Sequence, residues 1–126
     1  MPEARSKVLF IDSEATLTLA LSDALEDARL SFSPLLARTS DEALALLRDD
    51  PAIALIVLDL GLPEGGGSFL AHRILTDFPR TKLILTSTGL CDEEMAEFEG
   101  RAIGLLEKPF DLEDFVQLSH QGLVAL

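Results

Sequence analysis

Short apolar runs alternate along the chain with longer stretches in which apolar residues recur three and four positions apart. The apolar runs cover residues 8–11, 32–37, 52–60, 83–85 and 102–106, and Pro34 interrupts the second of them. Because apolar residues fill consecutive positions, each run predicts a strand that is buried on both faces of a sheet. The recurrent spacing predicts helices around residues 17–28, 43–47, 70–78 and 112–116, and the more polar segment 92–99 is interpreted as a fifth helix.

These segments follow one another as strand and then helix, five times over. Such alternation predicts a parallel sheet with helices on both of its faces. Two helix starts support this interpretation: Thr39 followed by Glu42 is a capping-box pattern, and Asp111 stands where an N-cap is expected. A chain of 126 residues has the length of one domain, so we expect residues 1–126 to form a single α/β domain.

Composition and charge exclude several classes of protein. The chain is 48% hydrophobic and 25% charged, which excludes disordered and fibrous proteins. Its net charge of −12 disfavours direct binding to nucleic acid and to anionic membrane surfaces. The single cysteine, Cys91, cannot form an internal disulfide, and no apolar run reaches the ~18 residues that a membrane span needs. We therefore expect a cytoplasmic protein whose fold depends on packing alone.

Polar residues end four of the five apolar runs. They are Asp12-Ser13-Glu14, Asp59, Thr86-Ser87-Thr88 and Glu107-Lys108-Pro109. The carboxyl ends of parallel strands meet at one edge of a sheet, so two carboxylates, a hydroxyl and an ammonium group converge there. Neighbouring carboxylates repel each other unless a cation joins them, and their oxygens suit a hard ion such as Mg²⁺. A hydroxyl and a lysine facing that ion would bind an anion.

With these residues in this order, the chain resembles the receiver domain of two-component response regulators, the CheY-like family. The resemblance covers essentially the whole chain and also includes Lys108-Pro109-Phe110, with Pro63 and Gly67 four and eight residues beyond Asp59. It implies a flavodoxin-like fold with five parallel strands in the order 2-1-3-4-5. It also implies that Lys108 and Pro109 are joined by a cis peptide bond.

The resemblance implies phosphotransfer as the function. A histidine kinase or a phosphotransfer protein would donate a phosphoryl group to Asp59, the expected phosphoacceptor. Asp12, Asp59 and the backbone carbonyl of Gly61 would hold Mg²⁺, and Lys108 would pair with the phosphoryl group. Mg²⁺ and the lysine would together offset the charge that develops on the transferring group. Such a domain is not an enzyme beyond self-directed phosphotransfer and autodephosphorylation.

A hydroxyl after the fourth strand would contact the phosphoryl group. We expect it to come from Ser87, because residues 82–85 then fill the strand, although counting back from Lys108 favours Thr86. The signal is expected to leave through the fourth helix, the fifth strand and the fifth helix. Its recipient would be a downstream protein or an attached output domain.

Two positions depart from the pattern of the family. Receivers place a second carboxylate at the position of Ser13, and we expect the neighbouring Glu14 to point away, because adjacent residues of an extended segment face opposite ways. Ser13 and Glu14 both remain candidates for a further metal ligand. Because neither matches the second carboxylate of the family, Mg²⁺ binding should be weak. Leu105 and Leu106 occupy the part of the fifth strand where receivers carry an aromatic residue, and the chain has no tyrosine.

These departures leave two alternatives open. One is a pseudo-receiver, which keeps the fold for protein–protein contact and has lost or weakened phosphorylation. The other, more remote, is a phosphatase of the haloacid-dehalogenase type, because the segment from Asp12 to Thr16 resembles that family's first motif. Glu14 replaces the second aspartate of that motif, and this reading leaves Asp59 without a role.

Overall fold

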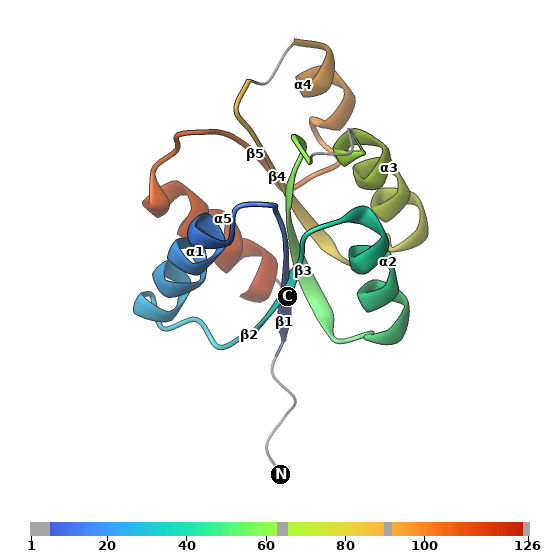
Figure 1. Ribbon diagram of the computed structural model, residues 1–126. Coiled ribbons are helices and arrows are strands. Elements are labelled where there is room, and N and C mark those ends of the chain that lie inside the picture. The colour runs from blue at the N-terminus through green and yellow to red at the C-terminus, as the bar shows by residue number, and fades with distance from the viewer. Residues whose placement is uncertain (1–5, 63–65, 90–91, 125–126) are drawn as a thin grey trace.

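The computed structural model describes residues 6–62, 66–89 and 92–124, and these form a parallel sheet in the order β2-β1-β3-β4-β5 with helices on both faces (Figure 1). The strands are β1 (Lys7–Ile11), β2 (Ser33–Ala37), β3 (Ile53–Asp59), β4 (Lys82–Ser87) and β5 (Gly104–Glu107). The helices are α1 (Ala15–Asp27), α2 (Ser40–Asp49), α3 (Gly67–Asp77), α4 (Asp92–Phe98) and α5 (Leu112–Val124). The predicted alternation, the strand order and the flavodoxin-like class are thus confirmed.

The two faces of the sheet pack against different helices. One apolar cluster joins the sheet to α2, α3 and α4 and includes Ala43, Ile74 and Phe98. The other joins the sheet to α1 and α5 and includes Leu25 and Phe115. Both clusters draw on the same strands, which explains why the strands are continuously apolar.

The strand register decides which polar residues share a face. Phe10 of β1 pairs with Val57 of β3, and Val57 pairs with Ile84 of β4. All three side chains lie in the cluster beneath α1 and α5. Because side chains alternate along a strand, the residues two positions further along emerge on that same face at the carboxyl edge. Those residues are Asp12, Asp59 and Thr86.

Helix and loop ends agree with several local predictions. The Thr39 hydroxyl caps α2 by accepting a hydrogen bond from the backbone N–H of Glu42 at 3.2 Å. The segment after residue 91 is helical, as its more polar pattern suggested. The Lys108–Pro109 peptide bond is cis. Pro63 and Cys91 lie outside the described residues. No helix within the described ranges has both the length and the apolar character to cross a membrane.

The strand at one edge of the sheet, β2, contains a proline. Pro34 pairs with Val8 of β1, and the preceding Ser33 donates its backbone N–H to the carbonyl of Ser6 at 2.9 Å. The backbone of Ser33 therefore faces β1, and the backbone nitrogen of Pro34 faces the open edge. A residue without an N–H is tolerated there because no strand lies on that side.

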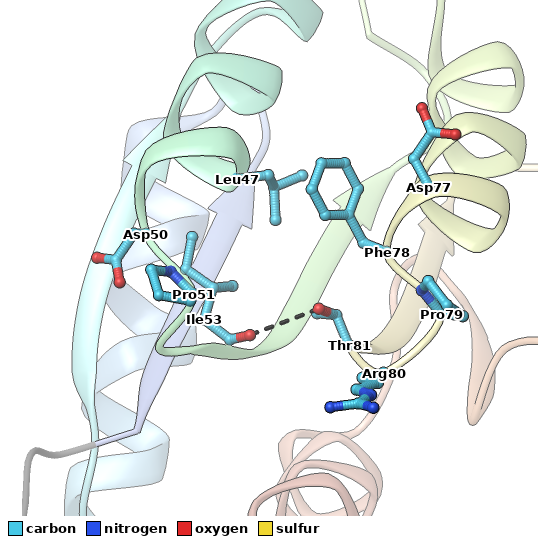
Figure 2. A pocket seen from close by; sticks show the side chains of 9 residues that line it. All are labelled: Leu47, Asp50, Pro51, Ile53, Asp77, Phe78, Pro79, Arg80 and Thr81. Atoms are coloured by element: carbon cyan, nitrogen blue, oxygen red, sulfur yellow. Dashed lines mark hydrogen bonds between the residues drawn. The ribbon is translucent and has the colours of Figure 1, made fainter.

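The amino edge of the sheet carries a cavity of about 350 Å³ (Figure 2). Leu47, Ile53 and Phe78 form much of its apolar lining, and the Thr81 hydroxyl donates to the carbonyl of Ile53 at 3.5 Å. Asp50 at its rim pairs with Lys7, and this hydrogen bond holds the pKa of the Asp50 carboxyl below its usual value. Asp77 of the same lining pairs with Arg73. The convergent polar groups lie at the opposite edge of the sheet.

Gly67 opens α3 in direct contact with the end of β3, and this contact yields a prediction. A Cβ at Gly67 would lie 2.2 Å from the backbone carbonyl oxygen of Leu60, which no side chain can relieve. Gly67→Ala should therefore lower the free energy of unfolding by at least about 1 kcal/mol. Gly89→Ala is the control, because a Cβ there meets nothing within 4 Å, and it should stay within ~0.5 kcal/mol of wild type. Equal losses in urea unfolding would contradict the packing argument.

Candidate functional site

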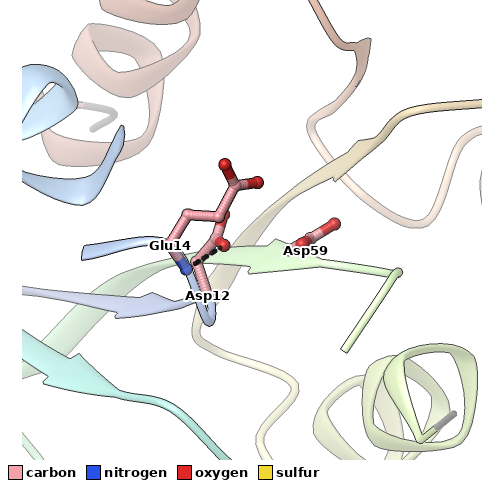
Figure 3. A group of neighbouring side chains, drawn as sticks. All are labelled: Asp12, Glu14 and Asp59. Atoms are coloured by element: carbon pink, nitrogen blue, oxygen red, sulfur yellow. Dashed lines mark hydrogen bonds between the residues drawn. The ribbon is translucent and has the colours of Figure 1, made fainter. Parts of the chain in front are cut away.

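Three carboxylates meet at the carboxyl edge of the sheet (Figure 3). Asp12 follows β1, Asp59 ends β3, and Glu14 precedes α1. One carboxylate oxygen from each lies within 4.8 Å of the other two. Asp12 and Asp59 are both 6% exposed, so two acidic groups are buried close together at this edge.

The ammonium group of Lys108 contacts all three carboxylates. Its Nζ lies 3.1 Å from Asp12 Oδ2, 3.4 Å from Asp59 Oδ2 and 3.5 Å from Glu14 Oε1. The backbone fixes the lysine in this place, because the Lys108 N–H donates to the carbonyl of Ser87 at 2.7 Å. A buried cation among acidic groups offsets the repulsion that would otherwise oppose this arrangement.

The pKa values of Asp12 and Lys108 are both raised, but for different reasons. Burial raises the pKa of the Asp12 carboxyl above its usual value, although the N–H of Glu14 and the Lys108 ammonium act against the shift. Burial by itself would lower the pKa of Lys108, but its hydrogen bond to Asp12 and the charges of Asp12 and Asp59 outweigh it, so the pKa is raised. Lys108 therefore stays charged at neutral pH.

The expectation that Glu14 points away from the site is wrong. The backbone N–H of Glu14 donates to Asp12 Oδ1 at 2.9 Å, and this bond turns the chain directly after β1 (Figure 3). Alternation counted from Asp12 also places residue 14 on the same side and Ser13 on the other. Ser13 is exposed, and Glu14 supplies the third carboxylate. Our error was to count alternation from Ser13 rather than from the inward-facing Asp12.

The register favours Thr86 over Ser87 as the hydroxyl on the face of Asp59. Thr86 is the register partner of Asp59, so their side chains emerge on the same face. The Thr86 side chain is 1% exposed, and its Oγ1 has no hydrogen-bond partner among the described residues. Ser87 belongs to the other face, where its Oγ accepts the backbone N–H of Gly89 at 3.3 Å. A buried hydroxyl without a partner is one that an incoming acceptor can satisfy.

The site fits a divalent cation. Three carboxylates and one ammonium group leave two formal negative charges, and the donors are all oxygens, which hard cations prefer. Gly61 lies next to this group, since its N–H donates to Asp59 Oδ1 at 3.0 Å. A Cβ on Gly61 would approach the same carboxylate oxygen to 3.5 Å. These residues therefore could hold a metal ion at the edge of the sheet.

A cavity beside Lys108 was not foreseen from the sequence. It has a volume of about 370 Å³, and its lining includes Leu17 from α1 with Phe110 and Leu112 from the segment after β5. These side chains come from distant parts of the sequence, so no local pattern could have revealed the cavity.

Leu105 of β5 stands where receivers were expected to place an aromatic residue. It is half-buried and packs against the apolar cluster beneath α2, α3 and α4.

Comparison with known proteins agrees with this architecture. The chain is 31% identical over 115 residues to the DNA-binding dual master transcriptional regulator RpaA of Synechocystis sp.. That match covers 87% of this chain and 46% of the relative, so the chain spans less than half of the relative's length.

Solved structures of other proteins superimpose closely on this chain. The signal receiver domain of an HD domain-containing protein from Pseudomonas fluorescens Pf-5 superimposes with a TM-score of 0.83 at 27% identity, covering 95% of each chain. A response regulator from Thermotoga maritima superimposes with a TM-score of 0.81 at 24% identity, covering 97% of this chain and 100% of the other. The family model for the response regulator receiver domain matches residues 8–120. With the convergent acidic group, the lysine and the parallel sheet, this match shows that the chain belongs to the response regulator receiver domain family.

Proposed function

We propose that this receiver accepts a phosphoryl group on Asp59 from a phosphohistidine of a kinase or phosphotransfer protein. The observation that carries the proposal is the 3.4 Å approach of Lys108 Nζ to Asp59 Oδ2 at the carboxyl edge of the sheet. An anionic nucleophile beside a fixed cation is the arrangement that phosphoryl transfer requires. Membership of the receiver family supports the same reaction class and argues against the phosphatase alternative.

In the proposed step, an oxygen of the Asp59 carboxylate attacks the phosphorus atom and forms a P–O bond. The P–N bond to the donor imidazole breaks, its electron pair stays on the imidazole nitrogen, and this nitrogen takes up a proton from solvent water. Lys108 moves from its carboxylate contacts to the phosphoryl oxygens, where its charge offsets theirs. The Thr86 hydroxyl, which has no partner in the described chain, donates a hydrogen bond to the same group.

We infer that the metal ion is Mg²⁺. Asp12, Asp59 and the backbone carbonyl of Gly61 would hold it, and of the two further candidates, Ser13 and Glu14, we favour Glu14. Bound there, Mg²⁺ would neutralise charge on the transferring group. A third carboxylate weakens the main argument for a pseudo-receiver, because the site has the acidic count that Ser13 had put in doubt.

We also infer how the signal leaves. Thr86 and Ser87 end β4, and Lys108 follows β5, so contacts with a phosphoryl group would bias the packing of α4, β5 and α5. The recipient would be a downstream protein or an attached output domain. RpaA is described as a DNA-binding regulator, but the net charge of −12 disfavours nucleic-acid contact by this domain itself.

The first prediction concerns the acceptor. Incubation with Mg²⁺ and a small-molecule phosphodonor such as phosphoramidate should add one phosphoryl group, read by intact mass. Asp59→Asn should abolish the adduct, because an amide is no nucleophile toward phosphorus. Asp50→Asn, at the opposite edge of the sheet, is the matched control and should leave labelling unchanged. Labelling that survives Asp59→Asn would refute the assignment, and a wild type that never labels would favour the pseudo-receiver.

The second prediction concerns Glu14. Losing one charged ligand costs ~1.5–3 kcal/mol, and because Glu14 is 63% exposed we expect the lower end of this range, about a tenfold loss of Mg²⁺ affinity in Glu14→Gln. Ser13→Ala is the control and should change the affinity less than about twofold. Calorimetric titration suits a chain without tryptophan or tyrosine. The opposite order of effects would show that Ser13 is the ligand.

The third prediction separates the two hydroxyls. Thr86→Val removes a buried group without a partner, so it should raise the free energy of unfolding by about 1 kcal/mol, while weakening the phosphorylation-induced change in hydrogen exchange. Ser87→Ala removes the acceptor of the Gly89 N–H, so it should lower stability by about 0.5–1 kcal/mol and preserve the response. A response that Ser87→Ala removes and Thr86→Val retains would reverse our assignment.

A further inference from the structure

Acidic residues are concentrated at the edge of the sheet that carries the candidate site. The first turns of α2, α4 and α5 contain acidic residues at positions 41–42, 92–94 and 113–114. Because each helix follows a parallel strand, these turns lie at the same edge as the three carboxylates of the site. Arg38 and Lys108 are the basic residues of this edge within the described chain. The carboxyl edge is therefore strongly negative.

The amino edge of the sheet has a different balance of charge. Its acidic residues are offset by basic residues that begin strands or end and follow helices, namely Lys7, Arg29, Arg48, Arg80, Lys82 and Arg101. Charges placed in this way complement the helix dipoles. They also leave the negative charge of the domain uncompensated mainly at the carboxyl edge, so the field there attracts positively charged molecules.

Two further features of this edge point to an occupant larger than a metal ion. The Thr86 side chain is 1% exposed, and its Oγ1 has no hydrogen-bond partner among the described residues, so it can donate to an incoming oxygen. The cavity of about 370 Å³ beside Lys108 is lined in part by Phe110 and by Leu112, which is 47% exposed. An occupant that brings an acceptor oxygen, an apolar group and positive charge would complement all of these features.

We propose that the carboxyl edge selects a protein phosphodonor whose histidine is surrounded by basic residues. This inference rests on the proposed phosphotransfer to Asp59. The phosphoryl group is an anion, so it approaches this edge against repulsion, and Lys108 offsets only part of that repulsion. Lysine and arginine residues around the donor histidine offset the remainder and raise the rate of association.

The experiment measures how two peptides bind to the unphosphorylated protein without Mg²⁺. Each peptide has one tryptophan and one histidine, and the histidine is flanked by four lysines in one peptide and by four glutamates in the other. The chain has no tryptophan, so the anisotropy of tryptophan fluorescence reports the peptide alone. At low salt the lysine peptide should bind at least about tenfold more tightly, and in about 0.5 M salt the difference should fall to about twofold.

A triple variant tests whether the attraction comes from the carboxyl edge. Asp92→Asn, Glu93→Gln and Glu113→Gln together neutralise exposed residues there, none of which belongs to the candidate site. The variant should weaken binding of the lysine peptide by about three- to tenfold. In amide chemical-shift titrations of wild type, the lysine peptide should perturb residues 12–14 and 107–111 most strongly.

The matched control neutralises the same residue types at the amino edge. Glu26→Gln, Asp27→Asn and Glu99→Gln are exposed positions, and this variant should change the affinity less than about twofold. Equal weakening by the two triple variants would show that only the overall charge of the domain matters, which would overturn the proposal. Equal affinity for the two peptides, or shift changes centred on the amino edge, would also overturn it.

Failure of the proposed phosphotransfer would give a different result. Binding of the lysine peptide at the carboxyl edge, without labelling of Asp59 by a phosphodonor, would retain the basic partner and exclude the reaction. Labelling of Asp59 without a preference for the lysine peptide would retain the reaction and exclude the basic partner.

Discussion

Repulsion between buried carboxylates is the constraint on which the carboxyl edge of this domain depends. Asp12 and Asp59 are held close together by the strand register, and Lys108 makes their proximity tolerable. Lys108, which follows β5, thus links the ends of β1 and β3 across the sheet, and the same ammonium also reaches Glu14. Any group that binds there must either replace this lysine among the carboxylates or share them with it.

The fold could be predicted because its signals are local and repeated. Continuous apolar runs identified the strands, and the residues that end those runs identified Asp12, Asp59 and Lys108 as neighbours. Where the sequence reasoning failed, the deciding contact was one that the linear pattern does not contain. The hydrogen bond that turns the chain at Glu14 is one such contact.

The choice between Thr86 and Ser87 also depends on a contact that the linear pattern does not contain, the register pairing of Thr86 with Asp59. The run of hydroxyls after residue 85 does not show which member faces the acceptor until the register is known. The cavity beside Lys108 is of the same kind, since α1 and the segment after β5 build it from residues far apart in the sequence. Counting back from Lys108 favoured Thr86, whereas filling the fourth strand favoured Ser87, and the alternation of side chains along β4 supports Thr86.

The last two residues of β4 face the two opposite sides of the sheet. Thr86 pairs in register with Asp59 and shares its face of the sheet, whereas the next residue, Ser87, emerges on the opposite face, and its Oγ accepts the backbone N–H of Gly89. A displacement of the peptide unit between Thr86 and Ser87 would therefore move side chains on both faces of the sheet. A helix with a single buried side chain, as α4 is within the described chain, is suited to respond to it.

The proline in the edge strand has a consequence for the behaviour of the protein in concentrated solution. Along β2, the backbones of Pro34 and Leu36 face outward, and Pro34 has no N–H, so Leu36 supplies the outward amide donor of this strand. A strand from another molecule that aligned here would find too few donors to extend the sheet. The exposed margin of the sheet is in this way protected against edge-to-edge aggregation without a covering helix.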